Sequence, residues 1–225
     1  DRPFTERAIR DSIDRAIDRL VRVDAFSGVV VVAKDGKPIY RRAVGVADRR
    51  WNVPNRIDTR FNVASIGKMF TAVAITQLVQ QGKLSYDDTL AKLLPDYPSR
   101  EIAQRITVRQ LLAHTSGIAP GFDLDSSFRR GLRTVKAYLP TSATDSLHFE
   151  PGTRLEYTSY GYLLLGAIVE RASGRDYYDY VREHVYRPAG MTGSDSYELD
   201  TDPPGIATGY MDASKGERRS NIFML

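Results

Sequence analysis

The sequence contains no cysteine among its 225 residues. A disulfide, a thiolate nucleophile and a cysteine-based metal site are therefore excluded, and the redox compartment is left open. The three histidines are far apart, and neither a His-x₃-His pattern nor a carboxylate cluster indicates a metal site. We expect no metal ion and no other cofactor.

A large excess of charge of one sign is also missing. The 32 Lys and Arg residues nearly balance the 28 Asp and Glu residues, which leaves a formal net charge of +4. Near the N-terminus arginines alternate with acidic residues, a pattern typical of the solvated face of a helix and not of a nucleic-acid footprint. We therefore expect no nucleic-acid partner.

Long apolar runs are absent as well. No run reaches the roughly 18 residues that a membrane-spanning helix needs, so we expect no membrane span. The given residues begin at Asp1 and show no signal peptide. Localisation stays unknown; an exported protein, periplasmic or extracellular, is slightly favoured because a leader can have been removed before Asp1.

Residues 1–60 have the pattern of an α+β domain. Apolar residues at helical spacing predict an amphipathic helix over Thr5–Val23. The β-branched run Val29–Ala33 predicts a strand covered on both faces. Asp35–Gly36 is a strong hairpin turn signal, and Pro38–Val46 follows as the second strand. We assign these residues to an antiparallel sheet domain.

Residues 61–225 are expected to form a mostly helical domain that carries the chemistry. Phe61–Gln81 is apolar on nearly every side and predicts one fully buried helix that ends at Gly82. A second buried helix is expected over Gly161–Ala172, ended by Gly174. Shorter helices are expected near 87–94, 107–114 and 176–186, and no strand is expected after residue 190.

The first turn of the helix at Phe61–Gln81 contains Ser65 and Lys68. Residues three apart lie on one face of a helix, so the hydroxyl and the amine can point at one spot. Burial favours the neutral form of an amine, and a neutral amine beside a serine is a general base beside a nucleophile. The alternative is structural, because Ser65 can cap the helix while Lys68 extends to solvent.

Tyr157 and Ser159 stand directly before the second buried helix. A phenol at such a position can relay a proton if a nearby cation lowers its pKa. Taken alone, such a pair more often caps or packs a helix. The histidines offer no competing nucleophile system, because Val63–Gly67 lacks the first glycine of Gly-x-Ser-x-Gly.

Together these segments resemble the serine β-lactamase superfamily. The resemblance rests on Ser65–Lys68, on LLAHTSGI at residues 111–118 and on EPGTRLEYTSYGYLLLGAIVERASG at residues 150–174. The nearest branch contains class C β-lactamases, D-peptidases and family VIII-type esterases, and the match runs from about Ser27 to Tyr210. It implies an antiparallel sheet flanked by helices plus a mostly helical domain, with the site between them.

The resemblance also implies residue roles. Ser65 matches the nucleophile that becomes acylated, and its backbone N–H would form half of the oxyanion hole. Lys68 matches the base or proton relay, and Tyr157 matches the tyrosine that shuttles protons to and from the leaving group. His114 matches a structural residue of the family. The substrate would be a small ester, amide or lactam.

Two departures concern the reading of the substrate. Ser159 replaces the asparagine of a Tyr-x-Asn motif, and residues 119–121, Ala-Pro-Gly, replace a region where class C β-lactamases carry a glutamine. A serine offers less to a substrate amide than an asparagine does. We therefore favour a carboxylesterase or a D-amino-acid amidase or peptidase. The alternatives are a β-lactamase or DD-carboxypeptidase, and a catalytically inactive ligand-binding or regulatory protein.

A third departure concerns the last family motif, a Lys-Thr-Gly or His-x-Gly, which the given residues do not contain. The hairpin of Val29–Ala33 and Pro38–Val46 is marginal by itself. We therefore expect the C-terminal part of the sheet domain to come from a complementing segment, supplied by further chain or by a second chain.

Overall fold

The computed structural model describes residues 5–119, 134–135, 146–197, 203–211 and 219–220. The chain divides into two compact units. Unit 1 contains residues 1–62 and 201–225, and unit 2 contains residues 63–200. The sequence assigned residues 201–225 to the helical domain, whereas the described residues 203–211 group with unit 1.

Backbone hydrogen bonds explain why residues 203–211 belong with unit 1. The N–H of Arg60 donates to the carbonyl of Gly205 at 3.0 Å, and the N–H of Thr208 donates to the carbonyl of Ala47 at 2.8 Å. Because these bonds join residues that are distant along the chain, the apolar and turn patterns of the sequence could not indicate them.

Unit 1 begins with helix α1 (Glu6–Arg22), capped by the Thr5 side chain. Strands β1 (Gly28–Lys34) and β2 (Lys37–Val44) pair antiparallel across a two-residue turn, as the sequence predicted. The turn residues Asp35 and Gly36 both have positive φ, 50° and 72°, which is the geometry of a type I′ hairpin turn.

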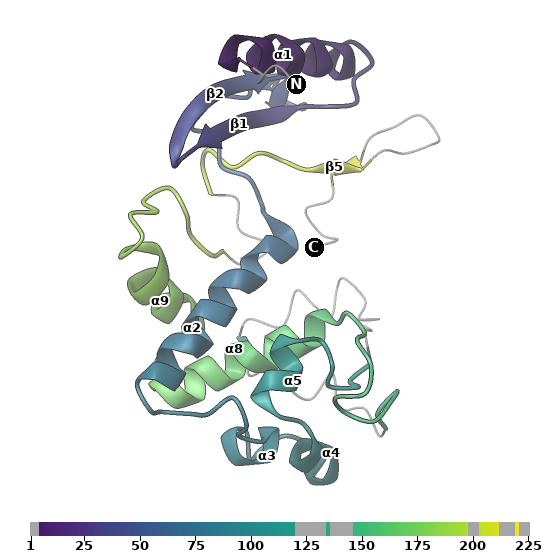
Figure 1. Ribbon diagram of the computed structural model, residues 1–225, viewed down its shortest axis with the longest axis vertical. Helices are drawn as coiled ribbons and strands as arrows, with labels where there is room; N and C mark the ends of the chain where they lie inside the picture. Colours follow the sequence, from purple (N-terminus) through teal and green to yellow (C-terminus); the bar gives the residue numbers. More distant parts are fainter. Residues whose placement is uncertain (1–4, 120–133, 136–145, 198–202, 212–218, 221–225) are drawn as a thin grey trace. The chain divides into compact units, whose positions relative to one another are not determined.

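Helix α1 lies along one face of this hairpin (Figure 1). Tyr40 Oη donates to Asp14 Oδ1 at 2.6 Å, and Arg42 pairs with Asp14 and with Asp18 at 2.8 and 2.5 Å. Val31 alternates to the opposite face and is 54% exposed. The expectation that β1 is covered on both faces is therefore wrong for the described residues.

Two shorter strand pairs complete the described part of unit 1. Strand β3 (Val46–Asp48) pairs with β4 (Val53–Pro54), and β5 (Tyr210–Met211) pairs with β6 (Arg219–Ser220). The expectation of no strand beyond residue 190 is wrong. It failed because strands of two residues are too short to show an alternating pattern.

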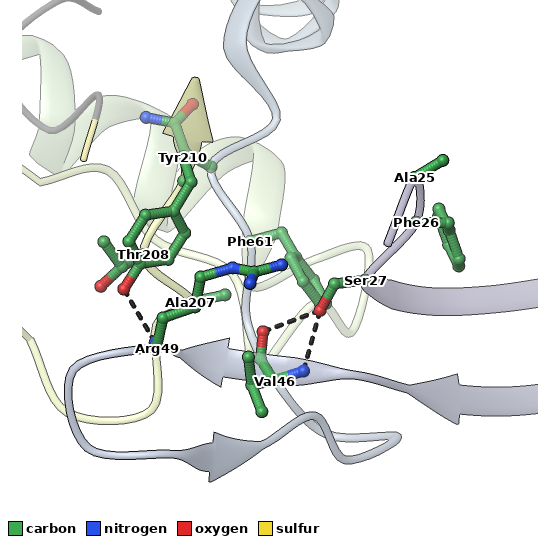
Figure 2. Close-up of a pocket in the computed structure, with 11 residues that line it drawn as sticks. Ala25, Phe26, Ser27, Val46, Arg49, Phe61, Ala207, Thr208 and Tyr210 are labelled. Atoms are coloured by element: carbon green, nitrogen blue, oxygen red, sulfur yellow. Dashed lines mark hydrogen bonds between the residues drawn. The ribbon is translucent and has the colours of Figure 1, made fainter. Parts of the chain in front are cut away.

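Gly45 separates β2 from β3 and needs to be glycine for two reasons. Its φ is +68°, and an added Cβ would lie 2.4 Å from Ser27 Oγ. The Ser27 hydroxyl bonds to both backbone groups of Val46, at 2.8 and 2.9 Å (Figure 2). Ser27 and Val46 line a cavity of about 320 Å³ whose lining belongs wholly to unit 1.

Unit 2 is built from helices. In chain order, the described helices are η1 (Ala64–Gly67), α2 (Lys68–Gln80), α3 (Leu90–Leu93), α4 (Arg100–Arg105), α5 (Val108–Leu112), α8 (Ser159–Ser173), α9 (Tyr177–Val181) and η3 (Arg182–Tyr186). A capping box of Thr107 with Gln110 starts α5, and Gly174 ends α8 at φ 69°. Helices α2 and α8 contact each other, and both contribute to the hydrophobic core (Figure 1).

The two apolar helices differ in how much of each is covered. Helix α8 is buried along most of its length, as expected. Helix α2 buries only the face of Thr71, Ala74, Ile75 and Leu78. The prediction of one fully buried helix over Phe61–Gln81 is therefore wrong: Val63, Ile66, Met69 and Val73 are 43–61% exposed.

Within the described ranges, no helix is long and apolar enough to cross a membrane. The same ranges contain no group of three or more His, Asp or Glu side chains placed to hold a metal ion.

Candidate active site

Ser65 lies in the short 3-10 turn η1, directly before α2. The N–H of Ile66 donates to the carbonyl of Val63 at 3.1 Å and closes this turn. Ala64 has φ 45°, a left-handed conformation that a residue with a Cβ rarely adopts. The turn leaves Ser65 exposed, and it places Lys68 at the first position of α2.

Tyr157 is positioned by a pairing between two segments that are distant in sequence. The N–H groups of His148, Gly152 and Glu156 donate to the carbonyls of Gly117, Thr115 and His114 at 2.8, 2.7 and 2.8 Å. The segment that leads to Tyr157 therefore runs beside the loop of the LLAHTSGI motif. This loop acts as a scaffold for the tyrosine.

Gly117 makes the close approach of these two segments possible. Its φ is +77°, and a Cβ at this position would lie 2.3 Å from the carbonyl oxygen of Phe149. A side chain is therefore excluded both by the backbone conformation and by the neighbouring segment.

The structure brings together all four residues that the sequence singled out. Ser65 Oγ and Tyr157 Oη are 2.6 Å apart. Lys68 Nζ donates to Ser65 Oγ at 3.0 Å and to Ser159 Oγ at 3.4 Å. The ammonium also lies 5.1 Å from the centre of the Tyr157 ring. A hydroxyl nucleophile, a phenol and an amine thus meet at one point.

The charge of Lys68 acts on its neighbour. The pKa of the Tyr157 phenol lies below its usual 10, first because of hydrogen bonding to Lys68 and second because of hydrogen bonding to Ser65. Burial of this 49% exposed side chain opposes the shift, but the hydrogen bonds to Lys68 and Ser65 outweigh it. Lys68 itself is half-buried, so the full burial on which its role as a neutral base depended is not present.

His114 is a site residue whose part the sequence did not show. Its Nδ1 accepts the backbone N–H of Thr158 at 3.3 Å. Its ring lies 4.6 Å from the Tyr157 ring and 5.1 Å from the Tyr162 ring, centre to centre. Its place in the LLAHTSGI segment was the available signal, although we interpreted it there as structural only.

The other two histidines lie elsewhere in unit 2. The His148 Nδ1 atom is 3.7 Å from a carboxylate oxygen of Glu156. The His184 ring packs against Tyr180, with ring centres 4.4 Å apart. A Ser-His pair is therefore not formed with either of them, and the hydroxyl partner of Ser65 is a tyrosine.

Comparison with known proteins identifies the family of this chain. The family model described as Beta-lactamase matches residues 13–222. The chain belongs to this family. The resemblance to the serine β-lactamase superfamily and the expected β-lactamase-like fold are thereby confirmed.

The relatives of this chain include a penicillin-binding protein and an esterase. Penicillin-binding protein 4* of Bacillus subtilis (strain 168) is 31% identical over 212 residues, which are 90% of this chain and 46% of that protein. Esterase EstB of Burkholderia gladioli is 33% identical over 226 residues, with coverage of 89% and 54%. The chain thus spans about half the length of these relatives.

A solved structure shows the same fold. The crystal structure of a penicillin-binding protein from Bacillus halodurans superposes with a TM-score of 0.79 at 33% identity, covering 93% of this chain and 66% of that one.

The structure places the two departures from the family pattern near each other. Ser159 is the first residue of α8. The carbonyl of Ala119 accepts a hydrogen bond from Thr158 Oγ1 at 3.3 Å, one residue before Ser159. Pro120 and Gly121 lie outside the described residues. The two positions at which the resemblance led us to expect amide side chains therefore carry a hydroxyl and a methyl group.

Proposed function

We propose that this protein is a serine hydrolase that forms an acyl-enzyme on Ser65. The observation that carries the proposal is the contact among Ser65, Lys68 and Tyr157. Ser65 Oγ lies 2.6 Å from the phenol oxygen of Tyr157 and 3.0 Å from the amine of Lys68. A nucleophile within hydrogen-bond reach of a base that a third group orients is the signature of an activated hydroxyl.

The proton on Ser65 is taken by Tyr157 in the proposed mechanism. Lys68, as an ammonium, stabilises the phenolate form of Tyr157. The phenolate accepts the proton of the Ser65 hydroxyl while Oγ attacks the substrate carbonyl. Tyr157 then returns this proton to the leaving group, and water enters to release the acid.

This assignment differs from the role that the sequence first suggested for Lys68. Lys68 donates to two hydroxyls, and hydrogen bonding to Lys68 is the first cause of the lowered pKa of Tyr157. Both observations support the role of a fixed cation for Lys68. The developing oxyanion would be bound in part by the backbone N–H of Ser65, at the start of a helical turn.

We infer that the substrates are short-chain esters or D-amino-acid amides. The Ser159 hydroxyl already accepts from Lys68 at 3.4 Å, and Ala119 has no polar side chain. A site that lacks a hydrogen-bonding group gains nothing from the matching group of a lactam or peptide. An ester also requires less help for its leaving group. β-Lactamase or DD-carboxypeptidase activity is the second candidate, favoured by the family as a whole.

Loss of catalysis is the remaining alternative, in which the fold only binds ligands or regulates a partner. The intact contact among Ser65, Lys68 and Tyr157 argues against it. An inactive protein has no need for a half-exposed phenol with a lowered pKa beside a serine.

The proposal is tested by labelling with a fluorophosphonate probe. The wild type should be labelled, and Ser65→Ala should lose labelling without losing its thermal transition. Ser194→Ala changes an exposed serine outside the site and is the matched control; it should label like the wild type. Labelling that survives in Ser65→Ala would show that another residue is the nucleophile.

The substrate class is tested by comparing kcat/KM for p-nitrophenyl butyrate, a D-alanine p-nitroanilide and nitrocefin. We expect the ester or the D-amino-acid amide to be preferred. Ser159→Asn restores an amide side chain and should shift the ranking toward nitrocefin. A clear preference of the wild type for nitrocefin would reverse the assignment.

A further inference from the structure

His114 connects the scaffold loop to the tyrosine of the site. It follows α5 and has φ 57°, a conformation in which histidine is one of the more tolerant residues. Its carbonyl accepts from the Glu156 N–H at 2.8 Å, and its Nδ1 accepts from the Thr158 N–H at 3.3 Å. One residue thus holds the backbone on both sides of Tyr157.

The imidazole ring extends this hold to the side chain of Tyr157. The two rings are 4.6 Å apart with an interplanar angle of 36°. The Tyr162 ring also lies 5.1 Å from the imidazole ring, centre to centre, and the Tyr162 hydroxyl donates to the Leu112 carbonyl at 3.0 Å. The phenol of Tyr157 is therefore oriented by a ring that is itself packed in place.

We propose that neutral His114 is a positioning residue that holds Tyr157 against Ser65, and that its protonation disengages this pair. The inference rests on the proposed function, which supplies the role of Tyr157. His114 touches neither Ser65 nor substrate in this account; it acts through Tyr157.

The chemistry of Nδ1 explains why protonation matters. An imidazole nitrogen accepts a hydrogen bond only while it carries no proton. The Thr158 N–H requires Nδ1 in this unprotonated state. Once Nδ1 is protonated, two donors face each other, and the bond that fixes the residue after Tyr157 is lost.

The charged and titratable groups around His114 make protonation at neutral pH unfavourable. Lys68 of α2, Tyr157 before α8 and Tyr162 of α8 face this ring. The pKa of His114 lies below its usual 6.5, first because burial disfavours the cation and second because Lys68 repels it. His114 is therefore mainly neutral at pH 7, and because its pKa is lowered it becomes charged only in a more acidic range than an ordinary histidine does.

Two substitutions of His114 distinguish the contribution of its hydrogen-bond acceptor from that of its aromatic ring. His114→Asn keeps an oxygen near the position of Nδ1, tolerates the left-handed backbone and has no proton to gain. His114→Phe keeps an aromatic ring beside Tyr157 but removes the acceptor. His184→Asn removes a histidine that packs on Tyr180 and serves as the matched control.

The measurement is the second-order rate of fluorophosphonate labelling of Ser65 from pH 4.5 to 9. The wild type and His184→Asn should show a step of lost labelling below pH 6.5. His114→Asn should keep labelling within about 3-fold of the wild type at pH 8 and lack this step. His114→Phe should lose at least about 10-fold at pH 8, because a displaced catalytic group is costly.

The result that overturns the proposal is a wild-type step that persists in His114→Asn, or a folded His114→Phe that labels like the wild type. If His114→Phe fails to fold, the His114→Asn profile decides by itself. An NMR titration of His114 and Tyr157 separates this inference from the proposed function, because it needs no labelling. The Tyr157 ring signal should move with the titration of His114; independence of the two would contradict the inference even in an inactive protein.

Discussion

Helices α2 and α8 have similarly apolar sequences but play different parts in unit 2. Leu164, Leu165, Ile168 and Val169 of α8 are fully buried. On α2, Ile66 just before the helix and Val73 within it are 61% and 43% exposed. Apolar composition therefore indicates that a helix contributes to a core, but it does not tell how many of its faces are covered.

The difference between the helices matches what each supplies to the site. The exposed turn η1 and the first position of α2 supply the proposed nucleophile Ser65 and the amine of Lys68. Helix α8 is capped by the buried Thr158, which is 1% exposed, and it holds the preceding Tyr157 by its connection to the core. The α2 side thus supplies the proposed nucleophile and the amine, and the α8 side supplies the phenol together with its rigid support.

The largest effect is expected from Tyr157→Phe. Removing the base from the α8 side should lower the labelling and turnover rates about 10²- to 10⁴-fold, while the melting temperature stays close to that of the wild type. In the wild type these rates should rise with pH through the lowered pKa of Tyr157, below 10, because the phenolate is the active form. The variant should lack this rise.

Tyr86→Phe is the control for this prediction, because it removes a phenol that donates to Thr76 outside the site. It should react like the wild type. Equal rates for Tyr157→Phe and Tyr86→Phe would mean that α8 contributes support alone and no chemistry.

A smaller effect, on the scaffold of Tyr157, is expected from Gly117→Ala. We expect a loss of about 2–4 kcal/mol in unfolding free energy, from left-handed strain together with the contact to Phe149. Gly82→Ala has the same type of φ, +69°, with nothing within 4 Å of the added Cβ. It should cost only about 1–2 kcal/mol. Denaturant unfolding of both variants measures the difference, and equal losses would show that the close approach to Phe149 is unimportant.

The smallest effect is expected on the free energy of unfolding, when a valine is replaced by alanine on each of the two helices. Val169→Ala, on the buried α8, should lower the unfolding free energy by about 2 kcal/mol through lost burial and a cavity. Val73→Ala, on the exposed face of α2, should change it by less than about 0.5 kcal/mol. Equal losses in thermal or denaturant unfolding would show that the exposed face of α2 is covered in solution.

Elements defined by neighbouring residues were predictable from the sequence. The Thr5 cap of α1, the Asp35–Gly36 turn and the Thr107 capping box each depend on residues within a few positions of one another. The pairing of residues 203–211 with unit 1 and the open face of α2 were not predictable, because they depend on contacts between distant segments.

The candidate site divides in the same way. Ser65 and Lys68 are three residues apart on one helical turn, so their spacing alone was informative. Tyr157 lies 92 residues from Ser65, and only the family resemblance joined the two. The contact of His114 with Thr158 spans 44 residues and uses a backbone N–H. Because every residue except proline has such a group, the residue type at position 158 could not indicate this contact.

The central claim, an acyl-enzyme on Ser65, is tested most directly by mass spectrometry after an acid quench during ester turnover. The account predicts that the protein gains the mass of one acyl group and that peptide mapping places it on Ser65. Ser65→Ala should show no such gain and no turnover above background. An acyl group on another residue, or undiminished turnover by Ser65→Ala, would contradict the account.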